Sequence, residues 1–119
     1  MLASKNRLKK KINFARIEID GKMIQSRSFG MGIFNRKDED ESRFGFIIST
    51  KISKKAVTRN RIKRIMSEVI RFNLTKLKKG LDIVFLIKPS IIKIDKIELE
   101  KETYEAITKN IQNNTLSNS

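Results

Sequence analysis

Two short apolar segments flank a long amphipathic segment in the middle of the chain, and this order restricts the fold more than any other feature. Residues 43–50 (RFGFIIST) and 82–88 (DIVFLIK) are almost continuously apolar, which is typical of strands buried on both faces of a sheet. The segment between them follows a helical pattern from Ala56 to about Lys79. Strand, helix and strand in this order predict a β-α-β crossover, with the two strands as parallel neighbours.

A basic helix and a further strand are predicted before the crossover. Residues 6–19 form one helical stripe of apolar residues, and Gly21 is expected to end this helix. The stripe consists of Leu8, Ile12, Ala15 and Ile19. Residues 28–35 predict a strand, because Phe29, Met31 and Ile33 alternate with smaller residues. Residues 35–42 predict a polar loop to the next strand.

A closing amphipathic helix is predicted after Pro89. Its apolar face consists of Ile97, Tyr104, Ile107 and Ile111. With 119 residues, of which 39% are hydrophobic, the chain can build one core, so residues 1–111 are expected to be a single domain. Residues 112–119 are polar and are expected to form a disordered tail. The fold class is therefore α/β, as an α+β sandwich: a small mixed sheet packed with about three helices.

The charge of the chain indicates a polyanionic partner. Lys and Arg number 27 and Asp and Glu number 13, which gives a formal net charge of +14. Nucleic acid is the most common polyanion matched by such an excess. No apolar run approaches the roughly 20 residues of a membrane span, and no secretory signal begins the chain. We therefore expect a cytoplasmic protein with no membrane partner and no obligate protein partner.

The absence of His and Cys limits the chemistry that the chain can perform. Cys- or His-based nucleophiles are excluded, and so are zinc sites that use either residue type. We predict no catalytic residue and no metal ligand on the protein itself.

The predicted helix from Ala56 combines an apolar face with a strongly basic one. A helical projection places Ile62 at the centre of a buried face, whose other members are Ile65, Met66, Val69, Ile70 and Phe72. The opposite, exposed face consists of Asn60, Arg64, Ser67 and Arg71. Lys63 and Arg61 flank that exposed face. Arg59 lies at the edge of the apolar face, where its stem can cover the core while its charged head stays in solvent.

Positive charge is concentrated around this helix. Residues 51–79 contain eleven basic residues and one acid, Glu68. A solvated helix stabilised by ion pairs would alternate charges at i, i+4, and this one does not. RNA is favoured over the major groove of DNA because no heptad zipper follows the basic segment, and because Arg can both bind phosphate and stack on bases.

The segment "TRNRIKRIMSEVIR", residues 58–71, resembles the signature of the protein subunit of bacterial ribonuclease P. The preceding "FGFIISTKISKKAV" carries Ser49 and Lys51 at the matching places. "NRLKKKINF" is similar to the N-terminal basic helix of that family, which ends in Phe, and "DIVFLIKP" is similar to its apolar strand ending in a basic residue and Pro. Four elements in the same order make this resemblance specific.

The resemblance implies a compact α/β fold whose crossover is left-handed, against the general rule of right-handed connections. It also implies that the chain is the accessory protein subunit of an endoribonuclease. In that family a large RNA hydrolyses precursor tRNA with the help of Mg²⁺ and removes the 5′ leader. The expected partners are therefore the catalytic RNA and the leader, and the expected Mg²⁺ belongs to the RNA subunit.

The resemblance also assigns two sets of binding residues. The set that faces the catalytic RNA is Arg59, Asn60, Arg61, Lys63 and Arg64. The set on or near the leader cleft is Phe14, Ser49, Lys51 and Lys88. Stacking of a base on Phe14 would fit single-strand recognition, whereas the alternative is that Phe14 belongs to the core. Ser49 has the alternative of a simple turn residue.

The sequence departs from the family pattern at two places. Glu18 stands where many relatives have a second aromatic residue, and an acid beside a phosphodiester backbone would weaken leader binding. Ile65 stands where a further cation is common, and residues 66–70 are less basic than usual.

Two other functions remain open: a ribosomal or RNA-chaperone role for the same basic helix, and a self-sufficient nuclease. The nuclease would use the acids of the polar loop, Asp38, Glu39, Asp40 and Glu41.

Overall fold

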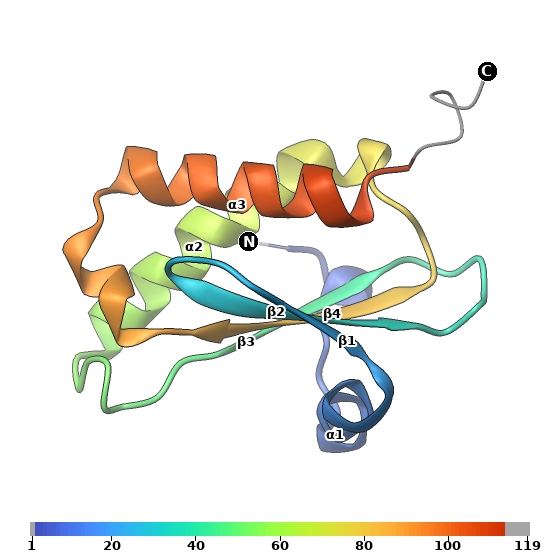
Figure 1. The fold of residues 1–119 in the computed structure, drawn as a ribbon, viewed down its shortest axis with the longest axis horizontal. Coiled ribbons are helices and arrows are strands. Elements are labelled where there is room, and N and C mark those ends of the chain that lie inside the picture. Colours follow the sequence, from blue (N-terminus) through green and yellow to red (C-terminus); the bar gives the residue numbers. More distant parts are fainter. Residues whose placement is uncertain (1, 114–119) are drawn as a thin grey trace.

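The computed structural model describes residues 2–113, which form a four-stranded sheet between two helical layers (Figure 1). The α-helices are α1 (Lys11–Asp20), α2 (Ala56–Asn73) and α3 (Lys96–Ile111). The strands are β1 (Lys22–Gln25), β2 (Phe29–Asn35), β3 (Arg43–Ile47) and β4 (Leu81–Ile87). Three short 3-10 helices complete the description: η1 (Ser4–Asn6), η2 (Leu74–Lys76) and η3 (Pro89–Lys93).

The sheet is mixed, as the sequence predicts. Its strand order is β1-β2-β4-β3, with antiparallel pairing except between β3 and β4. Those two strands pair in parallel, with Phe44 opposite Ile83 and Gly45 opposite Val84. The β-α-β unit with neighbouring parallel strands is therefore confirmed, and its left-handedness stays a prediction. Because β3 is an edge strand, Ile47 at its end is 42% exposed, so the expectation that β3 is buried on both faces is wrong.

The two faces of the sheet are covered unequally. Helices α2 and α3 lie on one face, and the shorter α1 lies on the other (Figure 1). The main core fills the α2–α3 side, where the ring of Phe85 contacts Phe29 edge-on and stacks on Phe46, both at 5.4 Å between centroids. On the other side only Leu8, Ile17 and Val84 form a buried cluster. Part of the sheet beside α1 thus stays accessible.

The N-terminal helix starts later than predicted and turns a different face to the sheet. Residues before Lys11 do not join α1, because Arg7 pairs in parallel with Phe44 and the amide of Leu8 donates to the Phe44 carbonyl at 2.9 Å. The predicted stripe is wrong: Ile12 and Ile19 are 73% and 80% exposed, whereas Ile17 is fully buried. The predicted stop at Gly21 is confirmed.

The two longer helices also differ from their predicted faces. In α2 the predicted core residue Phe72 is 72% exposed, whereas Ser67, predicted to be exposed, is 2% exposed. Ser67 is covered because the N-terminal segment and Phe46 lie beside it, which a helical projection does not include. In α3 Ile97 is 75% exposed and Tyr104 46% exposed. The buried face of α3 consists instead of Leu99, Thr103, Ile107 and Ile111.

After α2 the chain has less helix than predicted, and residues 112 and 113 are paired with the segment that follows α2. Helix α2 ends at Asn73 rather than near residue 79, and Leu77 then pairs with Gln112. The amide of Asn113 donates to the Lys76 carbonyl at 2.7 Å, so the first two residues of the predicted tail are held in place. Residues 114–119 of that tail lie outside the described residues. Within residues 2–113, no helix has the length and apolarity that crossing a membrane requires.

Candidate RNA interface

Two exposed basic residues of α2 line a groove between α2 and α3. Asn60, Arg61 and Arg64 are exposed and lie together there, in a groove of about 530 Å³. The apolar positions between them, Ile62 and Ile65, are buried and fix the helix on the core. In the part of the chain that the structure describes, neither Arg61 nor Arg64 forms an ion pair. Both guanidinium groups are therefore available to an anion from outside.

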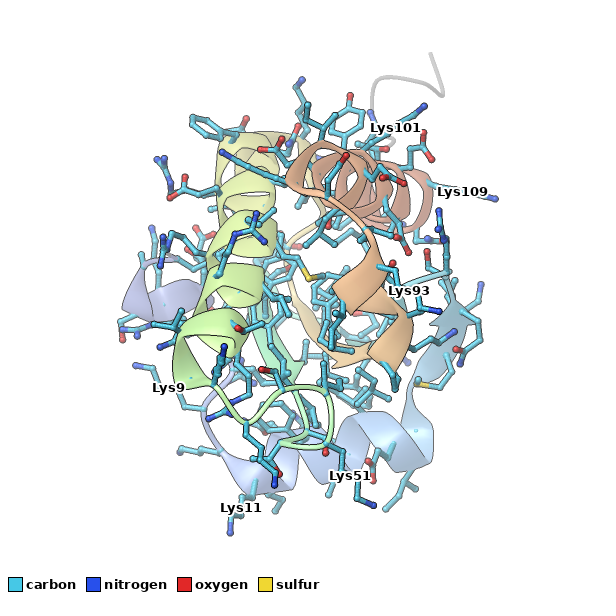
Figure 2. The ribbon with its side chains drawn as sticks, turned by 90° about the vertical axis from the view of Figure 1, so that its left-hand side faces the viewer. Lys9, Lys11, Lys51, Lys93, Lys101 and Lys109 are labelled. Carbon is cyan, nitrogen blue, oxygen red and sulfur yellow. The ribbon has the colours of Figure 1, made fainter. Side chains whose placement is uncertain are left out.

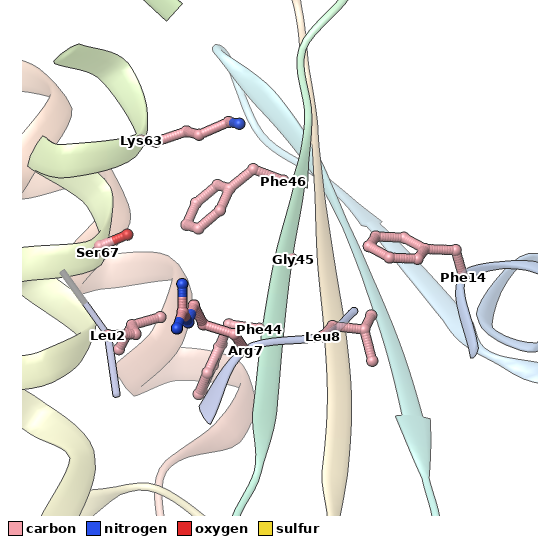
Figure 3. Close-up of a pocket in the computed structure, with 9 residues that line it drawn as sticks. All are labelled: Leu2, Arg7, Leu8, Phe14, Phe44, Gly45, Phe46, Lys63 and Ser67. Atoms are coloured by element: carbon pink, nitrogen blue, oxygen red, sulfur yellow. The ribbon is translucent and has the colours of Figure 1, made fainter. Parts of the chain in front are cut away.

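Lys63 and Arg59 do not share this groove. Lys63 lines a separate cavity of about 240 Å³ around β3, with Arg7 and Ser67 on the α2 side of the strand and Phe14 on the other side (Figure 3). Arg59 is partly buried, and its Nη1 donates to the Ser53 carbonyl at 2.7 Å, which ties the first turn of α2 to the preceding loop. The five residues assigned to the catalytic RNA thus fall into three groups: those of the groove, Lys63 in its cavity, and Arg59 at the loop before α2.

A second groove runs beside α1 on the opposite face of the sheet. Phe14 is half-buried, and it lines a groove of about 400 Å³ with Lys11, Ala15, Glu18 and Ile47. In Figure 3 the rings of Phe14 and Phe46 lie on opposite sides of β3. Phe14 therefore packs against the buried cluster on this side of the sheet and also faces the groove, whereas base stacking on its ring stays a prediction.

The other predicted leader residues follow the ends of two parallel strands. Ser49 and Lys51 are exposed after β3, where the Lys51 amide donates to Ser49 Oγ at 3.1 Å. Lys88 follows β4, and its Nζ donates to the Ser26 carbonyl at 2.7 Å. Because β3 and β4 are parallel, both strands end at the same edge of the sheet, and these residues therefore lie near each other. Ile47, the last residue of β3, lines the groove beside α1 and lies at the same edge. Lys51 projects from its loop towards the side of the molecule that carries α1 (Figure 2).

A buried carboxylate positions α1 and hence this groove. Asp82 is fully buried at the start of β4 and accepts two hydrogen bonds from Arg43, both at 2.7 Å. Arg36 donates to it at 2.5 Å and Arg16 at 3.2 Å, so one carboxylate joins β3, β4, the loop after β2 and α1. Burial alone raises the pKa of Asp82, but the hydrogen bonds and charges of Arg43 and Arg36 outweigh it and hold this pKa below its usual value.

Sequence reasoning missed this Asp82 cluster. The only signal in the sequence is an Asp at the start of an otherwise apolar strand, since a buried carboxylate needs cationic partners. Arg16 also lies over the ring of Phe34 at 4.5 Å from its centroid, which adds a second contact between α1 and the sheet. Phe14 lies two residues before Arg16 on α1, the helix that these two contacts hold against the sheet.

The acidic loop does not form a metal-binding cluster. Asp38 pairs with Arg36 at 2.9 Å, and Glu41 lies 3.9 Å from both Lys5 and Lys79. Among residues 2–113, no three acidic side chains lie close enough together to hold a metal ion. The hydrogen bond from Arg36 lowers the pKa of Asp38, with a further contribution from the Asp40 amide. Asp38 and Glu41 are therefore paired with basic neighbours rather than converging on one point.

A mixed four-stranded sheet carrying a strongly basic helix defines an α+β RNA-binding protein. The family model described as Ribonuclease P matches residues 2–111 of the chain. The chain therefore belongs to the ribonuclease P protein family, whose members are the accessory protein components of an endoribonuclease.

Curated relatives and solved structures agree with this assignment. The Ribonuclease P protein component of Clostridioides difficile (strain 630) is 35% identical over 107 residues, which cover 89% of this chain and 85% of the relative. That of Pseudanabaena sp. (strain PCC 6903) is 37% identical over 84 residues, covering 71% and 72%. The RNase P protein structure from Staphylococcus aureus superposes with a TM-score of 0.79 at 27% identity, covering 87% of this chain and 93% of that one. The corresponding structure from Thermotoga maritima gives 0.75 at 25% identity, covering 87% and 96%.

Proposed function

We propose that α2 binds the catalytic RNA of ribonuclease P and that the groove beside Phe14 binds the 5′ leader of precursor tRNA. As a member of this family, the chain acts with the RNA subunit in tRNA 5′ processing. In this proposal the two RNA contacts lie on opposite faces of the sheet. We also place this work in the cytoplasm, where bacterial tRNA precursors are made.

The observation that carries the first contact is a pair of exposed guanidinium groups on α2 that form no ion pair within residues 2–113. Arg61 and Arg64 are exposed one turn apart, with Asn60 beside them. Arg can bind phosphate oxygens through two hydrogen bonds, and an Asn amide can add contacts to sugar or base edges. Binding of a polyanion also relieves the repulsion between neighbouring cations on the helix.

The second contact is supported by the composition of the groove beside α1. It combines one accessible aromatic ring, Phe14, with the apolar side chain of Ile47 and the cation of Lys11. Grooves that bind single strands pair cations for the backbone with aromatic rings for the bases. Ser49, Lys51 and Lys88 extend the polar part of this surface past the ends of β3 and β4.

The hydrolysis itself we assign to the RNA subunit. Mg²⁺ held by that RNA would supply the activated water and stabilise the leaving oxygen. The role of the protein is to neutralise phosphates and to hold the leader in one orientation, which favours precursor over mature tRNA. Such positioning needs no acid or base on the protein.

The test is cleavage of a 5′-extended precursor tRNA at low Mg²⁺. Three reactions are compared: a bacterial ribonuclease P RNA alone, the protein alone, and both together. We expect cleavage at the mature 5′ end that requires the RNA and increases strongly with the protein. Activity of the protein alone would show a nuclease instead. Equal competition by precursor and mature tRNA would favour a general RNA-binding role without leader recognition.

A further inference from the structure

The groove between α2 and α3 contains an exposed aromatic ring that the proposed function does not use. Phe72 lines this groove with Arg61 and Arg64 and is 72% exposed. Val57, at the other end of the same groove, is 77% exposed. Lys96 contributes a further cation from α3. A basic groove with an aromatic ring at one end has the composition of a single-strand binding site.

The ring of Phe72 is held by its neighbours. The guanidinium carbon of Arg71 lies 4.6 Å from the ring centroid, which is within the range of a cation–π contact. Arg71 in turn donates two hydrogen bonds to Glu68, at 2.7 and 3.0 Å. The pair places one cation on the ring and leaves the part of the ring that lines the groove open. A stacking platform needs such an accessible and restrained ring.

The spacing along α2 separates a phosphate site from a base site. Phe72 follows Arg64 by eight positions, which is about 12 Å along the helix axis. The groove volume of about 530 Å³ is within the range of sites that enclose small organic ligands. A nucleotide segment can therefore place backbone phosphates on the arginines and a base on the ring at the same time.

We infer that this groove binds an unpaired nucleotide segment of the catalytic RNA, with phosphates on Arg61 and Arg64 and one base stacked on Phe72. The inference rests on the proposed function of α2 and adds the kind of RNA segment that it binds. Unpaired bases are required, because only a base outside a duplex can expose its face to an aromatic side chain.

The charges of the groove favour RNA over other occupants. A second copy of this chain, with its net charge of +14, would bring like charges together at Arg61, Arg64 and Lys96. An apolar peptide would cover these cations without compensating them. Glu68 and Glu100 also line the groove, but Glu68 is bonded to Arg71, and Glu100 lies one turn after Lys96 on α3. The carboxylate of Glu100 can accept a hydrogen bond from the amino group of a base.

The experiment uses the absence of Trp from the chain. Phe72→Trp introduces a single fluorophore into the groove, and Ile19→Trp introduces one on α1, where Ile19 is 80% exposed on the opposite face of the sheet. Each variant is titrated with the bacterial ribonuclease P RNA of the cleavage assay. We expect quenching by stacking in the first variant only. In a parallel titration, Phe72→Ala should weaken binding about tenfold without changing its salt dependence, since no charge is removed.

The outcomes separate this inference from the proposed function. Normal RNA binding by Phe72→Ala together with unquenched fluorescence of Phe72→Trp would overturn the inference. The proposed function would still stand if an Arg61→Ala, Arg64→Ala double variant lost affinity in the same assay, and it would fail if that variant bound normally. A change in the sedimentation of the free protein on Phe72→Ala, with RNA binding unaltered, would assign the groove to a second copy of the chain and also overturn the inference.

Discussion

The ring of Phe14 occupies the space that a side chain at Gly45 would need. A Cβ atom built on Gly45 would lie 2.7 Å from both Cε1 and Cζ of Phe14 and 3.2 Å from Cβ of Leu8. Such contacts are shorter than van der Waals separations allow, so glycine is required here by close approach. The absence of a side chain at Gly45 of β3 thus allows the Phe14 ring to pack close to the strand.

Gly45→Ala is therefore expected to displace Phe14 and to weaken leader binding. The affinity of the holoenzyme for precursor tRNA should fall about tenfold, which corresponds to the loss of one stacked base. Affinity for mature tRNA and for the catalytic RNA should stay unchanged, because α2 lies on the other face of the sheet. Equilibrium binding of both tRNA forms measures the effect. An equal loss for precursor and mature tRNA would contradict a leader role for Phe14.

Gly30→Ala serves as the matched control for folding. A Cβ atom at Gly30 would lie 3.3 Å from Oε1 of Gln25, at the end of a side chain that can move away. We expect this variant to lose less stability in urea unfolding than Gly45→Ala does, since overpacking that displaces a packed ring costs about 1–3 kcal/mol.

Glu18→Gln is expected to strengthen leader binding. Glu18 is exposed and lines the same groove as Phe14, where its carboxylate repels a phosphodiester backbone. Removing one exposed charge should raise the affinity for precursor tRNA by about two- to threefold, and the gain should shrink as salt is added. Glu105→Gln, which removes an exposed acid from α3 on the other face, is the control and should change nothing. A gain of equal size in both variants would show a general charge effect.

Asp82→Asn is expected to destabilise the fold by about 3 kcal/mol, because it leaves three arginines without their buried carboxylate. Urea unfolding at neutral pH measures this loss. Asp38→Asn is the comparison: its carboxylate also pairs with Arg36 but is exposed, so its loss should be much smaller. Similar losses in both variants would show that burial of Asp82 is not what matters.

The same substitution makes a prediction about pH. The pKa of Asp82 is lower in the folded protein than in the unfolded chain, where it is about 3.9. Its ionised form therefore stabilises the fold fully above about pH 4, and this contribution is lost as the pH falls from there through the folded-state pKa. The stability difference between wild type and Asp82→Asn should accordingly shrink below pH 4. A difference that stayed constant in acid would assign the effect to packing rather than to charge.

The sequence predicts those parts of the fold that depend on local periodicity. The apolar runs of β3 and β4, their parallel pairing and the basic surface of α2 follow from patterns within single segments. Strand β1 was missed because its four residues, KMIQ, are mostly exposed and carry no apolar alternation. The burial of Ser67 and the exposure of Phe72 depend on which segments cover α2, and no helical projection contains that information.

The candidate site also has parts that the sequence predicts and parts that only the folded chain shows. Spacing alone predicts Arg64 on the exposed face of the helix with Arg61 flanking it, and the structure shows both residues exposed on one groove. The separation of Lys63 into a different cavity could not be predicted, because Arg7 and the edge of β3 reach it from distant parts of the chain. The Asp82 cluster joins residues up to 66 positions apart, so only the folded chain brings its arginines together.

Lys63 lies apart from Arg61 and Arg64, so substitutions at these three residues of α2 can be compared to test where the catalytic RNA binds. Arg61 and Arg64 line the open groove, so each contact with a phosphate should contribute about 0.7–0.9 to the slope of log affinity against log salt. Arg61→Ala and Arg64→Ala should each flatten that slope by about this amount in titrations with a bacterial ribonuclease P RNA. Lys109→Ala, which removes an exposed cation from α3, should leave the slope unchanged. Because Lys63 shares its cavity with Arg7, Lys63→Ala should flatten the slope less than either arginine variant does. Slopes unaffected by both arginine substitutions would mean that the catalytic RNA binds elsewhere on the protein.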